Sequence, residues 1–130
     1  QLIDDSAPCP CGHPASYAQC CQRFLSGHDH PKTAEQLMRS RYSAFVVCDQ
    51  AHLLATWHEE TRPSKVRFND KHRWLGLRIY AADGGGEADI IGVVEYVARY
   101  KVDGKGHRLH ETSRFSKTGG RWYYLDGEHL

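Results

Sequence analysis

Four cysteines lie within thirteen residues near the start of the sequence, and they constrain the fold more than any other feature. They are Cys9, Cys11, Cys20 and Cys21. Thiolates this close together, in a segment with little apolar content, typically hold one tetrahedral metal ion, with zinc as the first expectation and iron as the alternative. The competing interpretations are a disulfide pair, which needs an oxidising compartment, and a reduced, unstructured tail. The pattern predicts a metal-binding knuckle with four thiolate ligands and no histidine.

Length and composition indicate the number of domains and the cellular compartment. The 130 residues are 40% hydrophobic and 25% charged, which is typical of one globular domain with a small appendage. The first five residues carry neither a basic flank nor an apolar stretch, so we expect no signal peptide. Apolar runs such as residues 90–94 are too short to span a bilayer. We therefore expect no membrane association and a cytoplasmic location, where thiols bind metal rather than form disulfides.

The charge balance bears on the class of partner. The sequence has 17 basic and 16 acidic side chains and a net charge of +1. Nucleic-acid binding driven by phosphate contacts requires a basic face, and this balance argues against one. A local basic run over residues 62–73 is interpreted as a solvated surface. We do not expect nucleic acid as a partner.

Hydrophobic periodicity divides the sequence into two units. Residues 1–30 form the cysteine knuckle and a linker, and residues 31–130 form an α+β domain. We expect the metal to organise the first unit only, because the second has its own apolar core. Thr33 is expected to cap a helix over residues 33–48, and the apolar stripe of this helix contains one charged residue, Arg41.

A second, shorter helix is expected to begin after Asp49, whose side chain suits an N-cap. Residues 64–72 are compatible with either a third helical turn or an irregular segment. Cys48, the fifth cysteine, lies on the first helix and is interpreted as a small, buried apolar side chain rather than a nucleophile.

The periodicity changes from helical to alternating at Trp74. Alternation and glycine-rich turns predict four strands, at residues 74–80, 89–102, 107–116 and 121–126. Short turns between consecutive strands make an antiparallel meander. The predicted fold class is therefore α+β, with helices packed on one face of a curved antiparallel sheet of about four strands.

Several motifs resemble those of YchJ-type bacterial proteins. The cysteine pattern resembles the SEC-C zinc motif, which is found at the C-terminus of the translocase ATPase SecA. The remaining motifs are LMRSRYSA at 37–44, LATWH at 54–58, TRP at 61–63, HETSRF at 110–115 and GRWYYLDG at 120–127. The resemblance implies a nuclear-transport-factor-2-like body, cone-shaped and hollow. Some members carry a second C-terminal cysteine motif, which is missing here, so we expect one metal site.

Three charged residues lie on faces that the patterns predict to be buried: Arg41, Glu95 and Glu111. Unpaired buried charges are costly, so two interpretations compete. In the favoured one, Arg41 forms an ion pair with Glu95 or Glu111 and ties the helix to the sheet. In the other, the three charges line a ligand cavity. The further candidates for that cavity are Trp57, His58, Trp74, His110 and Trp122.

The sequence contains no nucleophile elbow, phosphate loop or cofactor fingerprint. We therefore favour a non-catalytic protein, although an enzyme is not ruled out by sequence. The leading prediction is a macromolecular-recognition module whose zinc knuckle contacts a protein partner, by analogy with SecA. The alternative is a small-molecule-binding protein or enzyme that uses the cone cavity. An open polar cavity favours the alternative, and a cavity filled by tryptophans favours the first.

Overall fold

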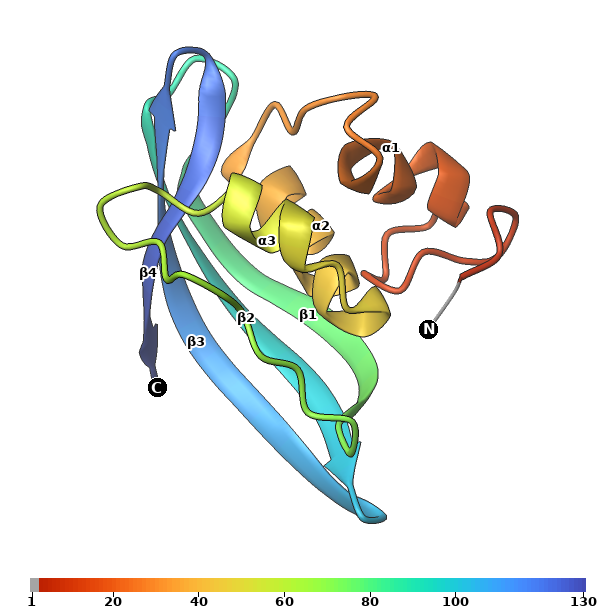
Figure 1. Cartoon of the computed structure of the whole chain (residues 1–130). Helices are drawn as coiled ribbons and strands as arrows, with labels where there is room; N and C mark the ends of the chain where they lie inside the picture. Colours follow the sequence, from red (N-terminus) through yellow and green to blue (C-terminus); the bar gives the residue numbers. More distant parts are fainter. Residues whose placement is uncertain (1–2) are drawn as a thin grey trace.

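The computed structural model describes residues 3–130. Gln1 and Leu2, which belong to the segment examined for a signal peptide and to the predicted 1–30 unit, lie outside the described residues. The elements are η1 Tyr17–Gln19, α1 Gln22–Leu25, α2 Ala34–Val47, α3 Gln50–Ala55, β1 Arg73–Gly84, β2 Ile91–Val102, β3 Lys105–Thr118 and β4 Arg121–His129. The helices lie on one side of a strongly curved sheet (Figure 1), which confirms the predicted α+β fold class. None of the helices between residues 3 and 130 has both the length and the apolar character needed to cross a bilayer.

Helix α2 begins and ends at residues with clear capping chemistry. Thr33 is the N-cap as predicted, and its side chain accepts a hydrogen bond from the Gln36 amide at 3.1 Å. The helix ends at Cys48, which has left-handed backbone angles (φ 58°, ψ 45°). This C-cap conformation leaves the Cys48 side chain exposed. The prediction that Cys48 is buried is therefore wrong, because the helical periodicity ends one residue before it.

Helix α3 also starts as predicted, since the Asp49 side chain accepts a hydrogen bond from the His52 amide at 3.0 Å. After α3 the chain is irregular to residue 72, so residues 64–72 form no helix. Near the start of this stretch, Trp57 forms an isolated parallel bridge with Tyr124 of β4. The flanking bonds are His58 N to Tyr124 O and Tyr124 N to Thr56 O, each 2.8 Å.

The four strands form an antiparallel meander in the order β1-β2-β3-β4. Two of its hairpins are two-residue turns in which both residues have positive φ, at Asp103–Gly104 and Gly119–Gly120. Such turns match the twist of the strands they join. Strands β1, β3 and β4 reach further than predicted, because hydrogen-bonded pairing continues into mostly exposed residues that carry no alternating pattern, whereas β2 begins at Ile91, two residues later than predicted.

Strand β1 contains a bulge that the alternation did not predict. Trp74 pairs with Tyr100 and Gly76 pairs with Arg99, which leaves Leu75 as the extra residue. Trp74 consequently faces the helices, where its ring lies 5.8 Å from that of Tyr42. Leu75 is 43% exposed, so it does not share a buried face with Leu77.

The main core lies between α2 and the concave face of the sheet, and the cysteine segment is part of it. Leu37 and Met38 of α2 belong to one buried cluster with Val94 and Phe115 of the sheet. Tyr17 and all four N-terminal cysteines belong to that same cluster. The cysteine segment therefore shares its buried side chains with the rest of the molecule.

The start of α2 sits directly on the β1–β2 hairpin. The Ala34 amide donates to the carbonyl oxygen of Gly85 at 2.9 Å. A Cβ added to Gly92 would lie only 2.9 Å from the Ala34 Cβ and 2.6 Å from the Gly85 Cα. The close approach of helix and hairpin thus requires glycine at position 92.

Candidate metal centre and adjoining cavity

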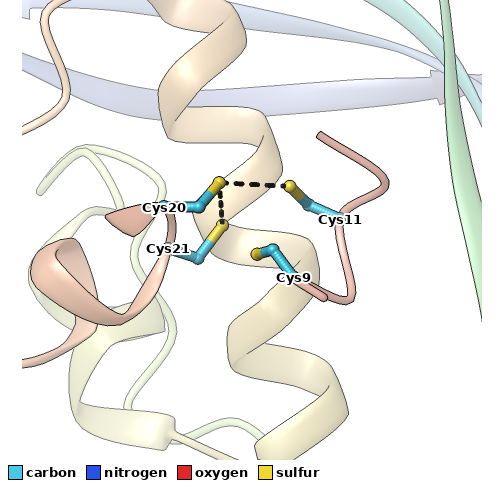
Figure 2. A group of neighbouring side chains, drawn as sticks. All are labelled: Cys9, Cys11, Cys20 and Cys21. Carbon is cyan, nitrogen blue, oxygen red and sulfur yellow. Dashed lines mark hydrogen bonds between the residues drawn. The ribbon is translucent and has the colours of Figure 1, made fainter. Parts of the chain in front are cut away.

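The four N-terminal cysteines come together in one compact, buried cluster (Figure 2). Their Sγ atoms all lie within 4.8 Å of one another. The Cys11–Cys20 and Cys20–Cys21 sulfur distances are 3.6 Å and 3.9 Å. In a tetrahedral zinc site with bonds of about 2.3 Å, neighbouring sulfurs are separated by about 3.8 Å. The cluster fits a tetrahedral metal ion with four thiolate ligands.

Two local turns bring the cysteine pairs together. Gly12, with φ 88°, allows a tight turn in which its amide donates to the Cys9 carbonyl oxygen at 3.1 Å. This turn places Cys9 and Cys11 on the same side of the loop. Cys20 ends η1 and Cys21 precedes α1, so the second pair lies at a junction of two short helices.

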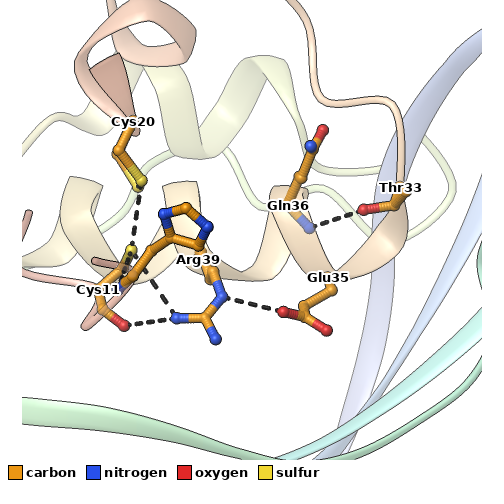
Figure 3. Close-up of polar contacts among 8 residues, drawn as sticks. Cys11, Cys20, Thr33, Glu35, Gln36 and Arg39 are labelled. Carbon is orange, nitrogen blue, oxygen red and sulfur yellow. Dashed lines mark hydrogen bonds and ion pairs between the residues drawn. The ribbon is translucent and has the colours of Figure 1, made fainter. Parts of the chain in front are cut away.

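Helix α2 supplies the polar groups that surround the cluster. Arg39 Nη1 donates to the Cys11 carbonyl oxygen at 2.8 Å and lies 3.9 Å from the Cys11 Sγ (Figure 3). Arg39 also pairs with Glu35 at 3.1 Å. Ser43 Oγ lies 3.8 Å from the Cys9 Sγ. Sequence reasoning missed Arg39, whose spacing from Glu35 indicates only an ordinary helix-surface ion pair.

The electrostatics of the thiols favour a bound cation. Burial raises the pKa of Cys20 to about 12. The pKa of Cys21 is raised because its thiol donates to Cys11 and Cys9, and the pKa of Cys9 is lowered because Cys11 and Cys21 donate to it. When no cation is bound, most of these thiols therefore keep their protons, and the cluster carries little negative charge. Four thiolates at this separation would need a cation to offset their charge, and Arg39 already places one positive charge 3.9 Å from the Cys11 Sγ.

A cavity of about 640 Å³ lies between the concave face of the sheet, α2 and residues 66–72. Four of the predicted cavity residues lie in its wall: Arg41, Trp57, Trp74 and Glu111. The apolar part of the wall includes Phe45, Val46, Phe68, Ala98, Tyr100 and Leu109. Unlike the metal cluster, this cavity is built almost entirely from the second predicted unit.

Arg41 is held in the cavity wall by hydrogen bonds and aromatic rings. Its Nη1 donates to the Leu53 carbonyl oxygen at 2.9 Å and to Thr56 Oγ1 at 2.8 Å, at the end of α3. Its Cζ lies 4.9 Å from the Trp57 ring centroid and 4.4 Å from that of Tyr124. These contacts fix the guanidinium between the two rings.

The predicted ion pair between Arg41 and Glu95 or Glu111 is wrong, because among residues 3–130 no ion pair includes Arg41. Glu111 does face the helices, but its oxygens bind other groups. Oε2 accepts from the Tyr96 hydroxyl at 2.5 Å, and Oε1 lies 3.1 Å from His129 Nε2.

Glu95 lies on the outer face of the sheet, so the prediction that it faces inward is also wrong. Tyr96 pairs with Glu111, which places both on the helix side, and the neighbours Glu95 and His110 point the other way. His110 Nε2 and Glu95 Oε2 are 2.7 Å apart. His110 and Glu111 thus lie on opposite faces, and His110 does not line the cavity. Valines flank Glu95 on its own face, and this apolar pattern is the reason why the outer face was predicted to be buried.

The other two candidates lie away from the cavity. Trp122 is buried, and its Nε1 donates to the Lys32 carbonyl oxygen at 3.1 Å. It lines a separate hollow of about 260 Å³ that also includes Phe24 and His52. His58 accepts a hydrogen bond at Nδ1 from the Glu60 amide, and its ring lies 6.2 Å from that of Tyr123.

Comparison with known proteins gives consistent matches over nearly the whole chain. Residues 33–127 match the family described as YchJ, middle NTF2-like domain. A UPF0225 protein of Chromobacterium violaceum is 48% identical over 125 residues, covering 93% of this chain and 92% of the relative. A UPF0225 protein of Methylibium petroleiphilum is 51% identical over 124 residues, covering 93% and 88%.

Two solved structures share the fold. The solution structure of a SEC-C motif containing protein from Rhodopseudomonas palustris matches with a TM-score of 0.82 and 31% identity, covering 94% of this chain and 98% of that one. The crystal structure of a SEC-C motif containing protein from Psychrobacter arcticus matches with a TM-score of 0.79 and 26% identity, covering 96% and 84%.

Proposed function

The chain belongs to the YchJ-type family of UPF0225 proteins, and from this membership we propose that it is a zinc-binding, non-catalytic recognition protein. The observation that carries the proposal is the buried cluster of four cysteine Sγ atoms within 4.8 Å of one another. The SEC-C motif of the two structurally similar proteins supports zinc over iron. Family membership was predicted from the sequence motifs and is confirmed.

The zinc would be structural. Cys9, Cys11, Cys20 and Cys21 would complete its tetrahedral shell, which leaves no coordination position for a substrate. The metal supplies a cross-link between the two cysteine pairs, and the segment it closes packs against α2 through the Arg39–Cys11 bond. Structural zinc sites in small modules contribute about 10–16 kcal/mol of apparent binding free energy at neutral pH.

The outer side of the knuckle is the proposed contact surface for a protein partner. Gly12, His13, Pro14 and Gln19 are exposed there. A metal-fixed loop presents such residues with little loss of conformational entropy on binding. A cytoplasmic location, in which the thiols stay reduced, is part of the proposal.

Elemental analysis tests the metal. Protein purified without added metal should contain about one equivalent of zinc, and Cys20→Ser should lose it. Cys48→Ser is the matched control, because Cys48 is exposed and lies outside the cluster. Disulfides without metal in freshly prepared, reduced protein would refute the metal proposal.

The recognition role needs a separate test. A His13→Ala/Gln19→Ala double variant should keep its zinc and lose the proteins that co-purify with the wild type from its own cells. A variant on the outer face of the sheet, Arg108→Ala, should keep them. Equal recovery with both variants would contradict the proposed surface.

A second candidate function is favoured by one observation. The cavity of about 640 Å³ is not filled by Trp74 and Trp122, because Trp74 lies in its wall and Trp122 packs elsewhere. Its wall also carries the charged residue Arg41. This arrangement supports small-molecule binding in the cavity, beside the structural role of the knuckle.

A further inference from the structure

Arg41 is a buried cation without an acidic partner. Its relative exposure is 4%, and none of the ion pairs among the described residues involves it. Burial lowers the pKa of Arg41 to about 10, so the guanidinium is still charged at neutral pH. Proteins rarely bury a charge without a counter-charge, because the lost hydration is not replaced. The cavity wall therefore carries a positive charge that an anion would balance.

The guanidinium has one edge free to bind that anion. Both of its hydrogen bonds come from Nη1, and Nε and Nη2 have no partner among residues 3–130. The Nε–Nη2 edge is the one that receives a carboxylate through two parallel hydrogen bonds. Trp57 and Tyr124 hold the guanidinium plane in place, so this edge is preorganised.

Another polar group of the wall agrees with an acceptor-bearing ligand. Trp57 Nε1 is buried without a hydrogen-bond partner in the described part of the chain, and Trp57 lines the cavity. An indole N–H can only donate a hydrogen bond. Glu111 and Asp70 also line the cavity, but among residues 3–130 neither forms an ion pair with Arg41, and the Glu111 carboxylate instead accepts from Tyr96 and faces His129.

The remaining wall suits a flat apolar body. The rings of Phe45 and Phe68 lie 6.0 Å apart, and those of Trp74 and Tyr100 lie 5.3 Å apart. Ala98 and Leu109 of the sheet complete the apolar surface. Pockets for small organic ligands typically have volumes of about 300–1,000 Å³, and this cavity lies within that range.

We propose that the cavity is a binding site for a small aromatic or alicyclic carboxylate, whose carboxylate binds the free Nε–Nη2 edge of Arg41 and whose apolar body packs against the aromatic wall. The inference rests on the second candidate function, small-molecule binding in the cavity. It adds the chemical class of the ligand and the residue that selects it.

A pair of probes that share one aromatic body and differ in their polar group, one charged and one neutral, tests the inference on the wild-type, metal-loaded protein. The probes are 2-naphthoate and its neutral analogue 2-naphthamide, titrated into ¹⁵N-labelled protein and followed by amide chemical shifts. We expect naphthoate to bind at least tenfold more tightly, with the largest shifts at Arg41, Tyr96 and Ala98. The wild-type comparison holds even where a variant fails to fold.

Variants then locate the charge preference. Arg41→Met should remove it, leaving the two probes within about twofold of each other. Arg108→Met is the matched control, because Arg108 is an exposed arginine bonded to the Tyr80 hydroxyl and should keep the preference. Leu109→Trp, which fills the cavity from β3, should weaken both probes at least tenfold.

Two results would overturn the inference, and they are distinguishable. Equal binding of both probes in the cavity of the wild type would leave small-molecule binding intact and remove the carboxylate class. No binding of either probe, or shifts confined to residues outside the cavity, would remove both the inference and the second candidate function. Neither result touches the zinc proposal, which elemental analysis decides.

Discussion

Arg39 Nη1 donates a hydrogen bond of 2.8 Å to the backbone carbonyl oxygen of Cys11, which joins the middle of α2 to the first cysteine pair. The two residues are 28 positions apart in the sequence. The same guanidinium lies close to the Cys11 sulfur, where it offsets part of the negative charge of the thiolates. The cysteine cluster is therefore built by the N-terminal segment and α2 together.

Arg39→Met should lower zinc affinity about tenfold, because it removes both the hydrogen bond that orients Cys11 and a positive charge near the thiolates. Competition with a chromophoric chelator measures the change. Arg114→Met is the control, since Arg114 is exposed and, within residues 3–130, forms its ion pair with Asp126, away from the cysteines. Equal affinities for the two variants would show that Arg39 does not support the metal site.

Chelation should reduce amide protection in α2 as well as in residues 3–30. The expectation from sequence was that the metal organises only the first unit. In the structure the four cysteines share one core with Leu37 and Val94, so loss of the metal also exposes the surface of α2. Hydrogen exchange with and without chelator measures this effect. Full retention of protection in α2 would show that the knuckle folds independently.

Cys48→Gly should stabilise the protein by up to about 1 kcal/mol, because relief of the Cβ penalty at φ 58°, about 1–2 kcal/mol, exceeds the entropy cost of glycine, about 0.5–1 kcal/mol. Cys48→Ala keeps a Cβ and should give no such gain. Urea denaturation of the two variants and the wild type provides the comparison. A loss of stability in Cys48→Gly would mean that the thiol contributes more than its exposure indicates.

His52 should make the fold sensitive to acid. Burial lowers the pKa of His52 to about 4, although Asp49 opposes the shift and Arg41 adds to it. The folded state therefore keeps the ring neutral while the unfolded state binds a proton below about pH 6.5. Stability is fully present above that pH and falls by about 3 kcal/mol as the pH drops toward 4.

Denaturation at pH 7.5 and pH 5 measures the effect, and His52→Gln is the comparison. Glutamine can still bond to Ser40 Oγ, the partner of His52 Nε2 at 2.9 Å. Acid also displaces zinc from thiolates in both proteins, so only the difference between their pH slopes reports His52. Identical slopes would contradict the prediction.

Gly92→Ala should destabilise the protein by about 1–3 kcal/mol, because the added Cβ would overlap Ala34 and Gly85. Gly106→Ala is the control, since a Cβ there meets nothing within 4 Å. Thermal melts of both variants test the contact between α2 and the hairpin. A small loss of stability in Gly92→Ala would show that α2 and the hairpin can move apart to accommodate the added methyl group.

Local chemistry made much of the fold predictable from sequence. Thr33 and Asp49 cap their helices through side-chain bonds to amides three residues ahead, and such bonds depend on little else. Glycine turns such as Gly119–Gly120 likewise determine where the chain reverses. The cysteine spacing was informative because four thiols so close together typically share one metal ion.

The failures were non-local. Both faces of β2 carry apolar residues, so alternation alone did not decide that Tyr96 faces the helices and Glu95 faces away. The partner of Arg41 proved to be the end of α3 and two aromatic rings, and the pairing of residues 56–58 with Tyr124 of β4 brings these together. The bulge at Leu75 adds one residue to the alternation, so Trp74 lies on the same face of the sheet as Leu77. Nothing in the local sequence marks this bulge.

The parallel bridge between Trp57 and Tyr124 has a consequence for solubility during folding and storage. Strand β4 lies at the end of the sheet order, where unpaired amides and carbonyls can template pairing with another chain. The bridge occupies the amide and the carbonyl of Tyr124, near the middle of that strand. The segment that follows α3 therefore covers the middle of this edge of the sheet and interrupts the row of free backbone groups that another chain would need for continuous pairing along β4.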